Sequence, residues 1–173
     1  MINMIKNKLK SQKYSDVKVS IFLLISIIVV FLLYVSNIIK SIPCQKNLLS
    51  NFYSNFFHIE ITHLISNIIG LYALSRIESN IGIKKFIKLI ILILLFNSVF
   101  ETILYMLFPN MLCSIGISGI LYGLITYEIC TNKEIDYVLI IYIFSSIIIP
   151  YKNVSVSSHI IGAISGIIIS NII

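Results

Sequence analysis

Long runs of apolar residues recur along the whole chain, and they limit its fold more than any other feature of the sequence. Hydrocarbon offers the backbone no hydrogen-bond partner, so the structures that cross a bilayer are helices and closed barrels. Apolar residues make up 58% of the chain and charged residues 12%, whereas about a quarter of the residues in a soluble domain are charged. The runs are long enough for membrane helices, and we predict an all-α membrane protein.

These runs predict six transmembrane helices. Pro109 and Pro150 mark positions where a helix cannot easily continue. The linker between the first two spans, roughly residues 40–55, has room for a short interfacial helix. The expected spans cover about residues 19–39, 56–77, 86–108, 118–131, 135–149 and 155–173.

The basic residues predict how these helices are oriented, because cytosolic loops carry an excess of Lys and Arg. Ten of them fall on one side, namely Lys6, Lys8, Lys10, Lys13, Lys18, Arg76, Lys84, Lys85, Lys88 and Lys133. The other three are Lys40, Lys46 and Lys152. We therefore expect both termini in the cytosol, with residues 1–18 as a basic tail and residues 19–173 as a six-helix membrane domain. Topology thus accounts for the net charge of +6, and we expect no nucleic-acid binding.

The fourth span is too short to cross the hydrocarbon. Residues 118–131 form about 21 Å of helix at ~1.5 Å per residue, and the hydrocarbon core is about 30 Å thick. If Thr131 lies at the cytosolic boundary, Ser118 lies roughly 9 Å below the outer boundary. The preceding segment 109–117 then enters the membrane as irregular backbone, which is tolerated only where protein covers it or water reaches it. This pattern predicts a water-accessible cavity open to the outer side, with Ser118 at its floor.

All three histidines of the chain, His58, His63 and His159, fall within the expected spans. Polar groups in hydrocarbon are expensive, and ionisable ones usually serve a function. Histidine and asparagine also hydrogen-bond between packed helices without any further role. Three histidines together with a submerged serine favour a functional site over that alternative.

The sequence GISG, residues 116–119, places Ser118 in the first turn of the fourth expected helix. The start of a helix has free backbone N–H groups and a positive dipole end, which suit a negatively charged oxygen. Gly116 and Gly119 allow the backbone to bend sharply and leave the hydroxyl uncrowded. A Gly-x-Ser-Gly motif is common in glycine-containing membrane helices, so its meaning depends on what lies beside Ser118.

The fourth and sixth spans each contain two glycines spaced four residues apart, which lets two helix backbones approach closely. These residues are Gly119, Gly123, Gly162 and Gly166. If the glycine faces pack together, Ser118 and His159 meet at a similar depth in the membrane. Tyr122 lies one turn beneath Ser118 and is expected to stack on the His159 ring.

Ser118 and His159 then form a nucleophile and its base. A serine hydroxyl is a weak nucleophile until a neighbour accepts its proton, and a neutral imidazole does this near pH 7. No acidic residue lies close to His159 in the sequence. We predict a Ser-His dyad without a carboxylate, and Glu101 in the third span is a less favoured third member.

His63 and Asn67 are four residues apart and therefore share one helical face. Both can donate a hydrogen bond to a developing oxyanion, together with the backbone N–H of Ser118. His58 lies nine positions before Asn67, which is about 180° around an ideal helix. We therefore expect His58 to support the site by bonding to loop backbone, away from the Asn67 face unless the helix start is distorted.

The histidine spacing argues against a zinc protease. Such an enzyme needs His-Glu-x-x-His, with the two ligands four residues apart and the glutamate beside the first. Here His58 and His63 are five apart, Glu60 is two residues after His58, and no Cys or Asp lies in the same region. We expect no metal and no other cofactor.

Four motifs, in order along the chain, resemble those of the rhomboid intramembrane serine proteases, and the resemblance covers about residues 19–173. The motifs are HIEITHLISN, SRIESNIG, GISGILYG and HIIGAISG. The resemblance implies a six-helix rhomboid-like bundle with a short fourth helix and a re-entrant loop before it. It also implies that Ser118 and His159 are catalytic and that His63 and Asn67 serve the oxyanion hole. The implied supporting residues are His58, Tyr122, Gly116, Gly119 and Gly162.

The resemblance also implies a substrate class. Members of the family hydrolyse peptide bonds in or near transmembrane segments, so the expected partners are single-pass membrane proteins and the lipid bilayer. Substrates would enter laterally, between the second and fifth helices, into a site open to the extracytosolic side. The chain departs from the family in having no Trp, in having Ile117 where Ala is usual, and in having Ser158 where a small apolar residue is common.

Two other functions compete with the protease interpretation. A non-catalytic membrane protein could bind transmembrane helices in the same groove. A small transporter is less favoured, because the chain shows no inverted repeat.

The cysteines leave one structural question open. Cys44 and Cys113 both fall on the expected outer side, so a disulfide is possible in an oxidising compartment. We favour unpaired cysteines packed among apolar residues.

Overall fold

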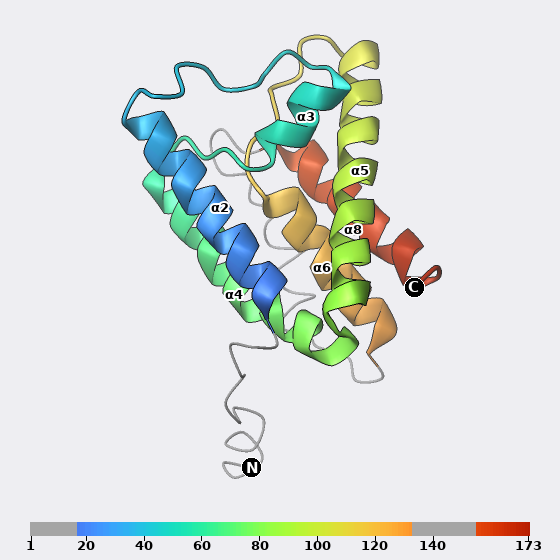
Figure 1. Cartoon of the computed structure of the whole chain (residues 1–173). Coiled ribbons are helices and arrows are strands. Elements are labelled where there is room, and N and C mark those ends of the chain that lie inside the picture. Colours follow the sequence, from blue (N-terminus) through green and yellow to red (C-terminus); the bar gives the residue numbers. More distant parts are fainter. Residues whose placement is uncertain (1–16, 133–154) are drawn as a thin grey trace.

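The computed structural model describes residues 17–132 and 155–173, and within them it contains six helices and no strands (Figure 1). The helices are α2 (Lys18–Val35), α3 (Leu48–Ser54), α4 (Ile61–Ile81), α5 (Ile83–Leu107), α6 (Ser118–Thr131) and α8 (Val156–Ser170). The fifth expected span, 135–149, and most of the basic tail lie outside the described residues, so both remain predictions.

The described helices follow the expected spans closely, except that the second one begins later than expected. The linker after the first span carries the short helix α3, whose Asn47 cap accepts a hydrogen bond from the Ser50 N–H. The second span was expected to begin near residue 56, but α4 begins at Ile61. Two helices, α2 and α5, are long and apolar enough to cross a membrane by themselves.

Helix α6 lies inside the bundle, between α4 and α5, and packs along α8 (Figure 1). Residues 119–128 of α6 are all buried. A Cβ atom added to Gly162 would collide with the Gly119 carbonyl oxygen, and one added to Gly166 would collide with the Gly123 carbonyl. The expected close contact between the two glycine-bearing helices is therefore present, and only glycine permits it.

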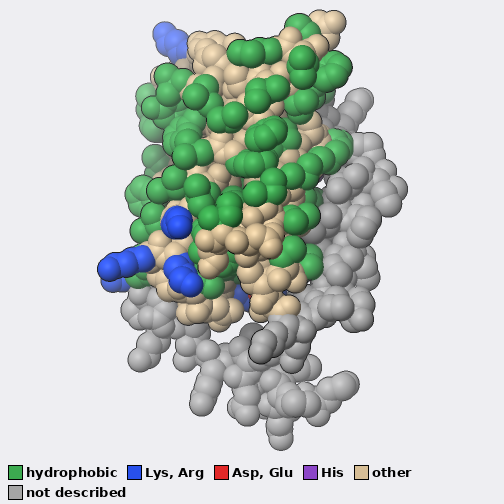
Figure 2. Space-filling model, turned by 90° about the vertical axis from the view of Figure 1, so that its right-hand side faces the viewer, with side chains coloured by type: hydrophobic (Ala, Val, Ile, Leu, Met, Phe, Trp, Pro, Cys, Tyr) green, Lys and Arg blue, Asp and Glu red, His purple; other side chains and the backbone are tan. Residues whose placement is uncertain are grey.

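The outside of the bundle is apolar. Figure 2 shows the face that lies on the right in Figure 1, where hydrophobic side chains cover much of the surface and most of the visible basic ones lie at its lower left. Exposed apolar side chains occur on several helices, for example Ile25, Ile69, Ile91 and Ile167. A surface of this kind suits hydrocarbon better than water.

Glu78 joins two helices at the lower end of the bundle, where α4 turns into α5. Its buried carboxylate accepts hydrogen bonds from the Val19 N–H, the Ser20 N–H and the Ser20 hydroxyl, each 2.8 Å long. The first turn of α2 has N–H groups without helical partners, and Glu78 satisfies two of them. Gly82 makes the turn with a φ of +82°, a conformation that other residues rarely adopt.

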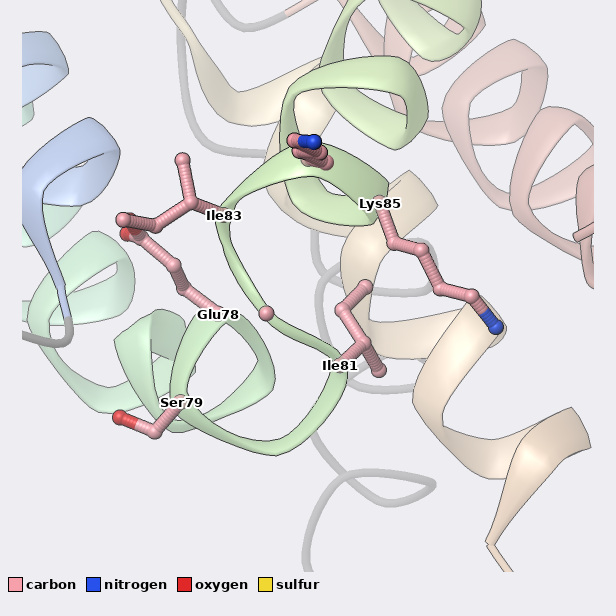
Figure 3. A pocket seen from close by; sticks show the side chains of 7 residues that line it. Glu78, Ser79, Ile81, Ile83 and Lys85 are labelled. Atoms are coloured by element: carbon pink, nitrogen blue, oxygen red, sulfur yellow. The ribbon is translucent and has the colours of Figure 1, made fainter.

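A hollow of about 460 Å³ lies at the same turn (Figure 3). It is lined by Glu78, Ser79, Ile81, Gly82, Ile83, Lys84 and Lys85. The Lys85 side chain points away from Glu78 (Figure 3). None of the lining residues is one of the histidines, the asparagine or the serine singled out in the sequence.

Candidate functional site

Ser118 and His159 meet where α6 and α8 begin. Ser118 is the first residue of α6, and His159 is in the first turn of α8. The Ser118 Oγ lies 3.0 Å from the His159 Nε2. His159 is buried and Ser118 is half-buried. In the imidazole tautomer with its proton on Nδ1, Nε2 is free to accept the hydroxyl proton.

Tyr122 holds the His159 ring from one side. The two rings are stacked, with centroids 4.1 Å apart and planes 21° from parallel. Tyr122 is one turn after Ser118 on α6, so one helix carries both the hydroxyl and the ring that packs on the imidazole. The expected stacking is present, and it restricts rotation of His159.

No carboxylate supports the far nitrogen of His159 within the part of the chain that the structure describes, where His159 Nδ1 has no hydrogen-bond partner. Glu101 is buried in α5, but its carboxyl group contacts the Ser114 and Ser158 side chains instead. Glu101 therefore makes no hydrogen bond to the His159 ring in the described part of the chain.

Gly116 brings His63 and Asn67 close to Ser118. It has a φ of +102°, and a Cβ atom at this position would lie 2.7 Å from His63 Cε1 and 3.3 Å from Asn67 Nδ2. The backbone just before the serine therefore passes directly against both side chains. His63 Nε2 is buried and has no hydrogen-bond partner among the described residues, so it can donate to a ligand.

His58 lies on the same side as Asn67, and the expectation that the two are separated is wrong. The His58 Nε2 is 2.8 Å from the Asn67 Nδ2. The angle calculated for an ideal helix does not apply, because α4 begins at Ile61 and His58 lies in the loop before it. The buried His58 ring also contacts the backbone at Phe56 and the His63 ring, at 5.0 Å between centroids.

Cys44 and Cys113 form a disulfide, so the preference for unpaired cysteines is wrong. Their Cα atoms are 5.8 Å apart although 69 positions separate them in the sequence. The disulfide joins the linker after α2 to the segment before Ser118. The apolar pattern of the sequence does not reveal that these two loops lie close together. Cys130 is free and exposed.

Asn97 is a buried polar residue that lies against Gly119, and the sequence motifs do not include it. Asn97 is fully buried, and neither side-chain polar atom has a partner within the described residues. A Cβ atom on Gly119 would lie 2.8 Å from Asn97 Nδ2 and 2.6 Å from Ser158 Oγ. The spacing of Asn97 and Glu101, which are four residues apart and so share one face of α5, could have revealed it.

Comparisons with known proteins agree with these features. Residues 45–173 match the family described as the Rhomboid domain. The chain is also 29% identical, over 116 residues, to a protein of Acanthamoeba polyphaga mimivirus named "Putative rhomboid protein L523". The aligned region covers 65% of this chain and 68% of that protein. Because the family match extends over more than half of the chain, the protein belongs to the rhomboid family of membrane proteins.

Proposed function

We propose that the protein is a rhomboid-type serine endopeptidase that cleaves peptide bonds in or near the transmembrane segments of other membrane proteins. The observation that carries this proposal is the 3.0 Å contact between Ser118 Oγ and His159 Nε2. A hydroxyl within hydrogen-bond reach of an imidazole is the minimal arrangement for an activated serine. Stacking on Tyr122 keeps the imidazole in that position.

The first half of the reaction forms an acyl-enzyme. The Ser118 Oγ attacks the carbonyl carbon of the scissile bond while its proton moves to His159 Nε2. The tetrahedral intermediate collapses, the C–N bond breaks, and His159 gives its proton to the departing amine. The amine product leaves, and the acyl group remains as an ester on Ser118.

The second half repeats these steps with water. His159 takes a proton from the attacking water, the tetrahedral intermediate forms again, and its collapse breaks the ester bond. The proton returns from His159 to the Ser118 Oγ, and the new carboxylic acid leaves. The enzyme is then restored to its starting state.

An oxyanion hole beside Gly116 would stabilise both tetrahedral intermediates. The candidate donors are His63 Nε2, the free N–H of the Asn67 amide and the backbone N–H of Ser118. His63 Nε2 has no other partner in the described part of the chain. The His58 contact occupies one side of the Asn67 amide and leaves its second N–H for the substrate.

The proposed topology places this site towards the outer side of the membrane. Six crossings with both termini in the cytosol follow from the distribution of Lys and Arg. Single-pass membrane proteins would enter laterally, between the second and fifth spans. The substrate must unwind near the cleavage point, because a helix engages its own carbonyl groups in hydrogen bonds.

A serine-directed fluorophosphonate tests the proposal. Purified wild-type protein in detergent should be labelled, and Ser118→Ala and His159→Ala should not. The same three proteins, reconstituted with a single-pass transmembrane substrate, should show cleavage only for the wild type. Wild-type protein that binds the substrate without cleaving it, and labels no faster than Ser118→Ala, would instead identify a non-catalytic helix-binding protein.

A further inference from the structure

The irregular segment that leads to Ser118, residues 108–117, is attached covalently to a distant part of the chain. Cys113 lies five residues before Ser118 and is bonded to Cys44 in the linker after α2. Both cysteines are half-buried, so a small reductant can reach the bond. Lys46, two residues after Cys44, reinforces this connection by donating to the Pro109 carbonyl.

The same segment is also held by hydrogen bonds to the bundle. The Tyr105 hydroxyl accepts a hydrogen bond from the Ser114 N–H at 2.6 Å, and the Ser114 hydroxyl donates to Ser155 Oγ at 2.7 Å. The Gly116 N–H donates to the Ser54 carbonyl at 3.0 Å. The Tyr105 hydroxyl also donates to the Leu112 carbonyl at 3.2 Å, and the Glu101 carboxyl group contacts the Ser114 side chain. These attachments are non-covalent, whereas the disulfide is covalent.

The position of this segment matters to the candidate site. Gly116 passes directly against the His63 ring and the Asn67 amide, and two residues later the chain supplies the hydroxyl and backbone N–H of Ser118. A shift of the segment would therefore change the distance between the reacting oxygen and its candidate oxyanion donors. A misplacement of about 1 Å can cost roughly a hundredfold in rate.

We propose that the Cys44–Cys113 disulfide is a positioning element for Ser118, and that its reduction lowers turnover while the helices stay folded. The inference rests on the proposed protease function. In the reduction, a thiol reagent transfers two electrons and becomes a disulfide itself, and Cys44 and Cys113 each gain a proton as free thiols. The bond also implies that the segment before Ser118 faces an oxidising compartment.

The test compares the double variant Cys44→Ser/Cys113→Ser with Cys130→Ser, a matched control because Cys130 is free and exposed. Purified proteins in detergent are assayed for kcat and KM on a transmembrane substrate and for the rate of fluorophosphonate labelling. We expect kcat and the labelling rate of the double variant to fall by about tenfold or more, with KM and helical circular dichroism unchanged. Cys130→Ser should match the wild type.

Reversible reduction of the wild type gives the same information if the double variant folds poorly. Dithiothreitol should lower kcat of the folded protein, and removal of the reductant with reoxidation should restore it. The Cys130→Ser protein should respond in the same way, because it retains the disulfide. Mass spectrometry of the non-reduced protein should show Cys44 and Cys113 in one linked peptide.

Three results would overturn the proposal. The first is a purified wild-type protein in which Cys44 and Cys113 are free thiols after oxidation in air. The second is a double variant with wild-type kcat and only a lower unfolding temperature, which would make the bond merely structural. The third is Ser118-dependent labelling at a rate that does not change when the disulfide is removed, which excludes this inference alone, whereas a wild type without any Ser118-dependent labelling removes the proposed function with it.

Discussion

His58 Nε2 and Asn67 Nδ2 lie 2.8 Å apart, although the two residues are nine positions apart in the sequence and only Asn67 belongs to helix α4. An imidazole nitrogen without a proton accepts from an amide N–H. The His58 ring is fully buried and also packs edge-on against His63. One loop residue therefore contacts both of the side chains that we assign to the oxyanion hole.

Replacing His58 with Ala should lower kcat with little effect on KM. The Asn67 amide would lose the acceptor that orients it, and a hydrogen bond worth about 1 kcal/mol corresponds to roughly a fivefold loss of rate. Steady-state cleavage of a transmembrane substrate measures this. Ile59→Ala, which changes an exposed neighbour in the same loop, is the control, and an equal loss in both variants would contradict the specific role.

Replacing Asn67 with Ala should have a larger effect than replacing His58. Removal of one oxyanion donor typically costs about a hundred- to a thousandfold in kcat. Fluorophosphonate labelling should slow as well, because that reaction also develops negative charge on an oxygen beside Ser118. A variant that cleaves at the wild-type rate would exclude Asn67 from the oxyanion hole.

Gly162→Ala should separate α6 from α8 and disable the Ser118–His159 contact. The added methyl group would collide with the Gly119 carbonyl oxygen, which is backbone and cannot move aside alone. Overpacking of this kind costs about 1–3 kcal/mol. The displacement of α8 from α6 would also move the His159 ring away from Ser118. Thermal unfolding and substrate cleavage should both decline.

Gly70→Ala is the control for that variant. Its methyl group would meet only the end of the flexible Leu121 side chain, at 2.9 Å, so a small change in rotamer can relieve it. We expect a smaller change in unfolding temperature and substantial cleavage. Equal losses in the two alanine variants would contradict a specific requirement for glycine at the contact between α6 and α8.

Glu78→Gln should destabilise the bundle without altering the chemistry. The carboxylate accepts three hydrogen bonds at the start of α2, and hydrogen bonds to a charged group are worth about 1.5–3 kcal/mol each. We expect the free energy of unfolding to drop by about 2 kcal/mol, while kcat at low temperature stays unchanged. Glu60→Gln, at an exposed carboxylate with no capping bond, should unfold like the wild type.

The sequence was sufficient to predict the helical bundle and the meeting of Ser118 with His159. Apolar runs define membrane helices because hydrocarbon tolerates little else, and the paired glycines fix which helix faces touch. Helix α6 covers residues 118–131 as expected. The catalytic roles of these residues, the six crossings and the orientation in the membrane remain predictions.

The features that the sequence did not predict depend on contacts between residues that are distant in the sequence, or on where a helix begins. The start of α4 was misplaced because Phe56, Phe57 and Ile59 extend the apolar pattern upstream of Ile61, where the helix begins. The same error led to the expectation that His58 lies away from the face that carries Asn67. The disulfide was missed because hydropathy gives no distance between Cys44 and Cys113, and only the path of two loops brings them together.

The capping of α2 by Glu78 has a consequence for biosynthesis. Glu78 follows Ser20 by 58 positions in the sequence. At roughly 5–20 residues per second, the ribosome therefore makes the first turn of α2 several seconds before it makes Glu78. During that interval the first turn of α2 lacks the Glu78 carboxylate that accepts its hydrogen bonds. The packing of α4 beside α2 therefore completes the first turn of α2, and the two helices mature as one unit.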